Sequence, residues 1–143
     1  MHRNGYTRAS LAISLIAAAG LGYVAYLQYS LAQVDSVIAT TISGAHKAAK
    51  SVSKLKAEGN ASIELSKVTA LEGKGWKLSE NNQSYEYKVD GKVHATMTLD
   101  HASGKVVYKI DCGSFKESIA QQECSDTLDG TGRNYINTDE VPW

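Results

Sequence analysis

Proline and cysteine are scarce in this sequence of 143 residues, which holds one Pro and two Cys. A single proline excludes Pro-rich stalks, and 12 glycines without a period exclude collagen-like chains. The formal net charge is zero, so the chain lacks the overall basic charge of non-specific nucleic-acid binders. Because 43% of the residues are hydrophobic, the chain is not intrinsically disordered, and its length suits one domain.

Signatures of catalysis and of metal binding are also missing. The sequence has no His-Glu-x-x-His, no Cys-x-x-Cys and no Gly-x-Ser-x-Gly pattern. Its four histidines share no ligand spacing. Gly130-Thr131-Gly132 follows no strand-to-helix junction, where a phosphate loop would lie. We therefore expect a protein that is not an enzyme and that holds no cofactor.

The charges that are present divide between two parts of the chain. Residues 1–57 hold six Lys or Arg and one acid, Asp35, whereas residues 58–143 hold nine basic and fourteen acidic residues. A +5 part is thus joined to a −5 part. Such an asymmetry requires that the two parts be interpreted separately.

An uncharged run dominates the first part. Residues 9–34 carry no charge, and Ala9–Leu27 has few polar residues. A helix of that length reaches roughly 39 Å, which exceeds a bilayer core of about 30 Å. We expect a membrane helix, with Arg3 and Arg8 on the cytoplasmic side and the rest of the chain outside. The tyrosines at positions 23, 26 and 29 fall near the outer end, where the membrane meets water.

The helical pattern continues past this run and becomes amphipathic. From Val34 onward, apolar residues recur in steps of three and four, which places them on one helix face. Lysines occupy much of the remainder, and Gly59-Asn60 is a stop signal. The sequence predicts one helix from about Thr7 to Ala57. The apolar face consists of Val34, Val37, Ile38, Ile42, Ala45, Ala48, Ala49, Val52 and Leu55.

A row of small residues lies within the membrane run. Ser10, Ser14, Ala18 and Gly22 recur every four residues. This spacing lets two helix backbones approach closely, so we expect the row to be a helix–helix packing surface.

A second interpretation of the first part is a secretion signal. Ser30-Leu31-Ala32 has the small residues that a signal peptidase prefers, and cleavage there would leave a soluble periplasmic domain beginning at Gln33. The apolar run is longer than a signal peptide needs, and the helical pattern passes through the site unbroken. Both features favour a retained helix.

The N-terminal residues resemble the start of a type IV prepilin. Met1-His2-Arg3-Asn4-Gly5, followed by Tyr6-Thr7 and an apolar helix, is similar to the short basic leader of that family, and Gln28-Tyr29 falls where pilins carry Gln-Tyr. The resemblance implies cleavage by a prepilin peptidase after Gly5 and N-methylation of Tyr6. It covers about the first 55 residues in detail. Beyond them it extends to the order of helix, loop, antiparallel sheet and disulfide-closed loop.

Three residues depart from the pattern of the family. Ser10 stands where pilins have a Glu that neutralises the N-terminal amine of a neighbouring subunit, and a hydroxyl cannot cancel that charge. Arg8 adds a positive charge close by, and Leu27 replaces the Pro associated with a helix kink. These departures fit a minor pilin or a pseudopilin better than an ordinary major subunit.

The second part of the chain predicts a small antiparallel sheet. Ser84–Val89, Val93–Leu99 and Lys105–Ile110 alternate apolar and polar residues, and Asp90-Gly91 is a hairpin signal. One apolar sheet face would pack on the amphipathic helix. The expected fold is therefore α+β, with a long N-terminal helix on an antiparallel sheet of three or four strands.

The connector between helix and sheet has mixed character. Ser62–Leu71 fits either a short helix or an extended segment, so we expect a loop with one local element. Trp76 and Leu78 are expected to anchor the chain to the core.

The two cysteines, Cys112 and Cys124, both fall in the part expected outside the membrane. Two thiols in an exported domain are typically paired, so we expect a disulfide that closes a short C-terminal loop. A loop of that size constrains the unfolded chain by roughly 3 kcal/mol. Within it, Ser114–Gln122 is expected to make a helical turn.

The tail Ser125–Trp143 is polar, and we expect it to be a solvated acidic segment. Asp126, Asp129, Asp139 and Glu140 offer hard oxygen ligands, and some pseudopilins bind calcium in a C-terminal loop. The spacing is not that of an EF-hand, so we expect no metal site and retain these four residues only as weak calcium candidates.

These observations indicate a structural protein that resembles a type IV pilin subunit. The resemblance implies a leader (1–5), a long helix whose first part enters a filament core (6–57) and a head exposed for adhesion or partner contact (58–143). Its partners would be other pilin subunits, the prepilin peptidase, the assembly platform and the inner membrane, without nucleic acid. It would reside in the inner membrane of a Gram-negative-type bacterium as a precursor and then in an extracellular filament.

Two alternatives remain at this point. One is a minor pilin or type II secretion pseudopilin that initiates or caps a filament. The other belongs to a different class, and is a membrane-anchored or secreted periplasmic binding protein.

Overall fold

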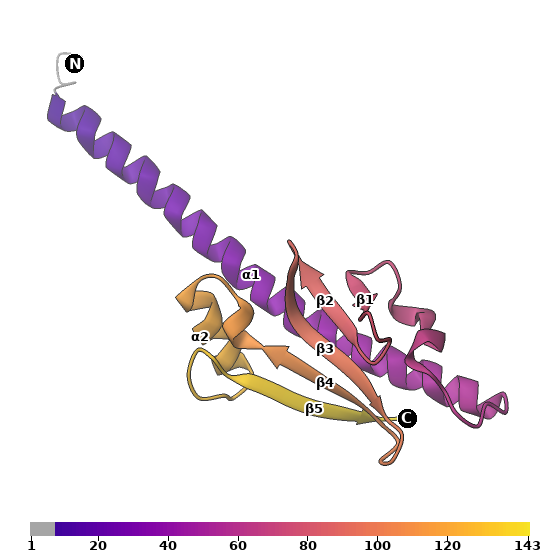
Figure 1. The fold of residues 1–143 in the computed structure, drawn as a ribbon. Coiled ribbons are helices and arrows are strands. Elements are labelled where there is room, and N and C mark those ends of the chain that lie inside the picture. Colours follow the sequence, from indigo (N-terminus) through magenta and orange to yellow (C-terminus); the bar gives the residue numbers. More distant parts are fainter. Residues whose placement is uncertain (1–7) are drawn as a thin grey trace.

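The computed structural model describes residues 8–143, with side chains from residue 22 onward. A long helix, α1 (Arg8–Ala57), lies along one face of an antiparallel sheet, and a short helix, α2 (Ser118–Thr127), packs beside it (Figure 1). The expected α+β arrangement of a helix on an antiparallel sheet is therefore confirmed. The sheet has five strands, however, instead of three or four.

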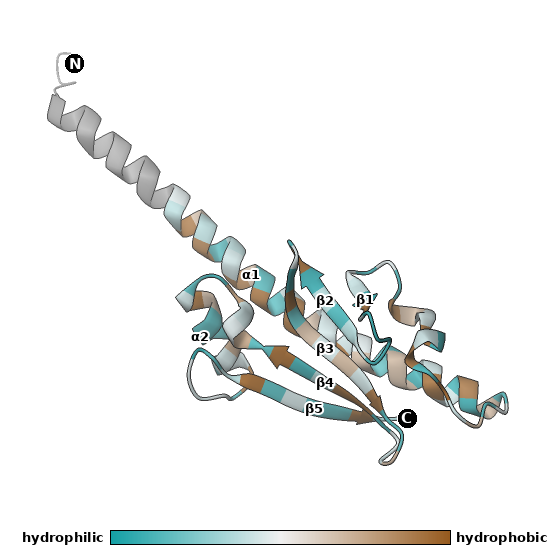
Figure 2. Cartoon of the chain, in the orientation of Figure 1, coloured by the Kyte–Doolittle hydropathy of each residue, from teal (hydrophilic) through white to brown (hydrophobic). Residues whose placement is uncertain are grey.

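Helix α1 has nearly the predicted bounds, and its predicted apolar face is buried or half-buried along its whole length. The lysines in the C-terminal half of α1 are exposed. Hydrophobic and hydrophilic residues therefore occupy different faces of this half, and both kinds are seen along the helix (Figure 2). Gly59 ends the helix at a φ of +93°, a left-handed conformation that glycine adopts without strain. Its N–H donates to the Lys56 carbonyl at 3.0 Å and the Asn60 N–H donates to the Leu55 carbonyl at 3.3 Å. The last carbonyls of the helix are thereby satisfied.

The sheet has the order β1-β2-β3-β4-β5, with each strand antiparallel to its neighbour. The strands are β1 (Trp76–Leu78), β2 (Tyr85–Val89), β3 (Lys92–Asp100), β4 (Lys105–Asp111) and β5 (Ile136–Pro142). Strands β2, β3 and β4 correspond to the three that alternation predicts. Between β2 and β3 the register shifts after Tyr87, which leaves His94 opposite no residue.

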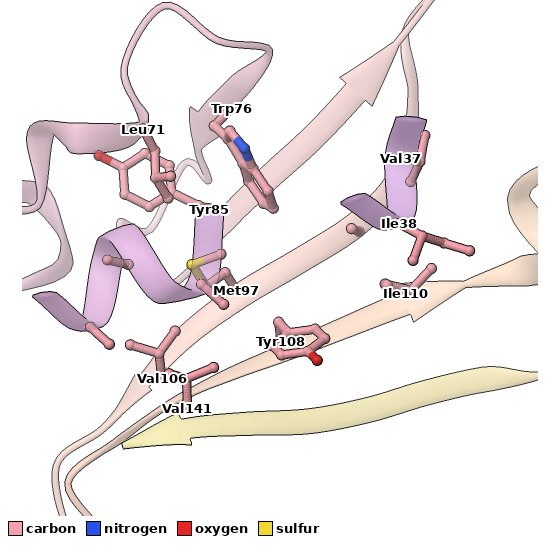
Figure 3. Close-up of a cluster of buried hydrophobic side chains, with 14 of the residues drawn as sticks. Val37, Ile38, Leu71, Trp76, Tyr85, Met97, Val106, Tyr108, Ile110 and Val141 are labelled. Atoms are coloured by element: carbon pink, nitrogen blue, oxygen red, sulfur yellow. The ribbon is translucent and has the colours of Figure 1, made fainter. Parts of the chain in front are cut away.

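The hydrophobic core lies between α1 and the sheet (Figure 3). Met97 and Ile110 are 0% exposed, and burying an aliphatic side chain of this size stabilises the fold by about 1.5–3 kcal/mol. Tyr85 is buried as well, and its O–H donates to the Val68 carbonyl at 2.8 Å. The hydroxyl is therefore not left unsatisfied in the core. The expected anchor Trp76 is also buried.

The C-terminal tail ends in a strand that the sequence does not predict, although most of its side chains are exposed. Strand β5 pairs with β4 along its whole length, and of its residues only Val141 is buried. Backbone pairing holds this strand at the edge of the sheet, so apolar alternation could not reveal it. Two side-chain contacts support the pairing. The Lys105 ammonium donates to the Glu140 carboxylate, and the Tyr108 O–H donates to the Asp139 carboxylate at 3.3 Å.

Cys112 and Cys124 form the expected disulfide, with their Cα atoms 5.4 Å apart. Cys112 begins a 3-10 turn directly after β4, and Cys124 lies in α2. The helical turn expected at 114–122 lies later, at Ser118–Thr127. It starts later because the chain is extended at Phe115 and Glu117 after the 3-10 turn.

The connector between α1 and β1 contains two 3-10 turns, Leu65–Lys67 and Thr69–Leu71. Leu65 and Leu71 are buried against the core. The sequence predicts one local element here, but the connector contains two. Each of the two turns places one leucine in the core.

Candidate functional site

The residues predicted for processing and helix packing lie near the N-terminus. Gly5 and Tyr6 are outside the described residues. Ser10, Ser14 and Ala18 lie in α1, but their side chains are outside the described part. The N-terminal part of α1 extends beyond the head (Figure 1).

The surface of α1 between Gly22 and Tyr29 is largely exposed and apolar, although Tyr26 also contacts the head. Gly22, the last of the small-residue row, is exposed, and a Cβ added there would meet no atom within 4 Å. Four large hydrophobic residues follow it with exposed fractions of 44% or more. They are Tyr23, Val24, Tyr26 and Tyr29. A cluster of this kind marks a surface that contacts another molecule or a membrane.

No helix in the range with described side chains is both long and apolar enough to cross a membrane. Residues 9–21 of the predicted membrane run lie outside that range.

The head holds α1 at a point inside the uncharged run. The Tyr26 O–H donates to Glu117 Oε1 at 2.8 Å, and Glu117 directly precedes α2. Ser30 is 7% exposed, and its Oγ donates to the Tyr26 carbonyl at 3.2 Å. Helix α1 is continuous through Ser30-Leu31-Ala32, the site considered for signal peptidase. The head therefore uses residues that such a cleavage would remove.

A cavity of about 290 Å³ lies where α1, the β2–β3 hairpin and the disulfide-closed segment meet. Tyr26 and Tyr29 line it from α1, and His94 and Ser114 line it from the head. Lys92, Lys116 and Glu117 are also among the lining residues. The cavity thus combines two aromatic rings with several polar and charged groups.

His94 is the buried titratable group of this cavity, with an exposed fraction of 4%. Its ring stacks on Phe115 with a centroid distance of 4.5 Å, and its Nδ1 lies 2.6 Å from Ser114 Oγ. The Ser114 hydroxyl donates to the Asp111 carbonyl, so His94 Nδ1 carries the proton that this hydroxyl accepts. The serine proton is already engaged, so the pair is not arranged as a nucleophile with its base.

Burial lowers the pKa of His94 from its ordinary value, because desolvation disfavours the charged imidazolium. The charge of Lys92 acts in the same direction, while Asp111 and Asp90 oppose it. The neutral imidazole is thereby favoured at neutral pH. The contacts with Phe115 and Ser114 indicate a structural role for His94.

The four acidic calcium candidates lie on two different elements. Asp126 is in α2 and accepts a hydrogen bond from Gln122 Nε2 at 2.8 Å, and Asp129 follows α2 with a φ of +55°. Asp139 and Glu140 lie in β5 with the partners described above. Across residues with described side chains, no three His, Cys, Asp or Glu are grouped so that they could hold a metal ion.

The cavity around His94 is the feature that sequence reasoning missed. Its residues come from positions 26 to 120, and the register shift beside His94 turns that side chain inward. Alternation from Val93 to Ala95 would place His94 on the outer face, so the sequence carries no signal for this site.

Comparison with known proteins yields no family: no family model, no curated protein and no solved structure matches the chain.

Proposed function

We propose that this chain is a structural subunit of a type IV pilus-like filament and that it assembles through the N-terminal part of α1. The observation that carries the proposal is a contrast within this one helix. From Val34 onward its apolar face is covered by the sheet, whereas at 23–29 its large hydrophobic side chains are exposed. A cluster of exposed large hydrophobic side chains on a helix is typical of a surface that contacts a membrane or another protein chain.

Two forces would drive assembly. Close backbone approach along the row from Ser10 to Gly22 would give van der Waals contact between helices, and Gly22 has open space for it. Removal of the apolar helix from water would add hydrophobic stabilisation once the subunit leaves the bilayer. The head would then form the outer surface of the filament, where adhesion or partner recognition takes place.

The hydrogen bond of Tyr26 to the head and the burial of Ser30 support a retained helix over a cleaved signal. Cleavage after Ala32 would remove the hydrogen bond to Glu117 and open one wall of the cavity. The proposal therefore includes maturation after Gly5 in the inner membrane, by a prepilin peptidase and an assembly platform. Ser10 in place of Glu favours a minor or initiating subunit within this class, such as a pseudopilin.

The decisive experiment is the intact mass and N-terminal sequence of the protein purified from its host. We expect a chain that begins at N-methylated Tyr6. The same preparation, examined by electron microscopy with antibody labelling of the head, should carry the protein on filaments.

A second candidate function is a membrane-anchored or secreted periplasmic binding protein. The cavity of about 290 Å³ beside His94 is the observation that favours it. A chain that begins at Gln33 or that retains Met1, with no label on filaments, would select this candidate and reject the filament subunit.

A further inference from the structure

A groove runs between the C-terminal half of α1 and the end of β5. It is open to solvent and has a volume of about 570 Å³. Its apolar residues are Ala49, Ala57, Val141, Pro142 and Trp143, and its polar ones are His46, Lys50, Ser53 and Lys54. The groove is thus apolar along part of its length and basic on the helix side.

The lysines beside this groove have no acidic partner among the residues with described side chains. Over residues 22–143 the ion pairs are Lys88–Glu86 and Lys105–Glu140, and neither involves α1. Lys56, just beyond the groove, lies with its Nζ 5.5 Å from the centroid of the Trp143 ring, so it contacts an aromatic face instead. Lys50 and Lys54 are exposed and one helical turn apart, so both are available to an external acidic surface.

The outward face of α2 has the complementary properties. Ile119, Glu123 and Asp126 follow one another at helical spacing, while Ala120 and Cys124 are buried on the inner side. Ile119 is 45% exposed, and Val24 and Ile136 are the other aliphatic residues among the exposed large hydrophobics of the described part. The stretch 117–129 holds four acidic residues and no basic one. An apolar residue therefore stands beside a row of carboxylates.

We propose that the outward face of α2 of one copy docks into the α1–β5 groove of a second copy. Ile119 would contact the apolar residues of the groove, and Glu123 and Asp126 would pair with Lys50 and Lys54. This contact deepens the proposed filament function and rests on it. The two surfaces differ, so the contact is heterologous and continues from copy to copy instead of closing a dimer.

The position of the two surfaces along α1 fits such a repeat. Ala120 of α2 lines a cavity together with Tyr29 and Gln33, whereas the groove lies at positions 46–57 of α1. About 20 helical residues separate the part of α1 beside α2 from the part that lines the groove, which corresponds to roughly 30 Å along the helix axis. Two parallel copies offset by that distance would bring α2 of one beside the groove of the other.

The test uses the full chain assembled in its host, prepared as an equal mixture of normal and nitrogen-15-labelled protein. A carbodiimide couples a lysine amine to a carboxylate only where the two are in contact. We expect linked peptides of mixed isotope composition that join Lys50 or Lys54 to Glu123 or Asp126. Assemblies that show other mixed links but none between these segments would overturn the proposal.

A second experiment exchanges the charges of the two surfaces. Lys50→Glu with Lys54→Glu should reduce the assembled protein about tenfold, because like charges would face each other across the contact. The links at these two positions are lost in that variant in any case, because the amines are gone, so the amount of assembled protein is the measurement. Adding Glu123→Lys and Asp126→Lys to that variant should restore assembly, and mixed links between the same two segments should return. Lys109→Glu, an exposed charge reversal on β4, is the matched control and should have no effect. A failure of the exchange to restore assembly would also overturn the proposal.

The two proposals can fail separately. Filaments that contain the mature chain but lack these links would leave the filament function standing and remove the docking contact. Links between copies in a chain that begins at Met1 and forms no filament would establish the contact and remove the filament function.

Discussion

At the scale of single residues, burial controls the protonation of His94. The folded-state pKa is lowered, so the unfolded chain binds the proton more readily than the folded one. The stabilising effect of the neutral imidazole is therefore complete above about pH 6.5, the pKa of the unfolded group, and is lost as the pH falls below it.

We predict that the free energy of unfolding falls between pH 7 and pH 5, and that His94→Phe makes this dependence weaker. Phenylalanine keeps the stacking on Phe115 but takes up no proton. At pH 7 the substitution should cost about 1 kcal/mol, because the hydrogen bond to Ser114 is lost. Urea unfolding followed by circular dichroism at each pH measures both effects.

Equal pH dependence in the two proteins would contradict this prediction. Asp100 does not obscure the result. Hydrogen bonds from Ser103 lower the pKa of its carboxyl, so its effect on stability falls in a more acidic range.

Gly130 occupies a position where no side chain fits. A Cβ there would overlap the ring of Tyr135, and the Tyr135 carbonyl accepts the Cys112 N–H at 3.0 Å. We predict that Gly130→Ala destabilises the protein by about 1–3 kcal/mol, because the loop must shift next to the disulfide. The same substitution in a Tyr135→Ala background should cost much less, and an equal cost in both backgrounds would exclude the steric explanation.

The sequence does not reveal the structural constraints on His94 and Gly130. The alternation of β3 would place His94 outward, and only the register shift beside it turns the ring into the cavity. Gly130 falls in a stretch that we expected to be a solvated tail. The constraint on it comes from Tyr135, which packs there because β5 returns to the sheet.

At the scale of elements, the strength of the apolar pattern decides what could be predicted. Helix α1 and strands β2 to β4 have faces that repeat with the helical or strand period, and each was recovered to within a few residues. β1 has three residues, too few to show a period. β5 buries only Val141, and it is held by backbone hydrogen bonds that any sequence can make.

The disulfide joins helix α2 to the end of the central sheet. Cys124 anchors it to the 3-10 turn after β4, and Gln121 Nε2 adds a hydrogen bond to the Phe115 carbonyl at 2.7 Å. We predict that Cys112→Ala with Cys124→Ala costs about 2–4 kcal/mol of unfolding free energy. Hydrogen exchange should accelerate in α2 and remain slow in β2 to β4 under native conditions.

An equal acceleration of exchange in α2 and in the central strands would contradict this local dependence. It would indicate that α2 and the sheet open as one cooperative unit. The docking surface on α2 would then be as rigid as the core.

At the scale of the whole molecule, the candidate sites are assembled from segments far apart in the sequence. The cavity joins Tyr26 to Ser114, and the groove joins Lys50 to Trp143. Composition and periodicity act over short windows and cannot bring such pairs together. The sequence did indicate the charge division between the two parts of the chain. The structure places part of the positive charge beside the groove and part of the negative charge on α2.

The junction between α1 and the head yields a prediction about the whole fold. A chain that begins at Gln33 keeps the α1 residues of the core but loses Tyr26 and Ser30. We expect it to fold, and to be about 1–2 kcal/mol less stable than a chain that begins at Gly22, because it lacks the hydrogen bond to Glu117 and its first helical turn frays. Urea unfolding of the two chains measures the difference.

Tyr26→Phe in the longer chain isolates the hydrogen bond from the rest of the segment. This substitution should lower the free energy of unfolding by at most about 1 kcal/mol, since the Tyr26 hydroxyl and Glu117 form their hydrogen bond at an exposed site. The remainder would come from Ser30 and the continuous helix. If the two chains were equally stable, residues 22–32 would add nothing to the head, and cleavage after Ala32 would regain its place as the better account of the N-terminal run. A clear loss means instead that residues 22–32 contribute to the stability of the head, which is consistent with the proposed retention of this segment.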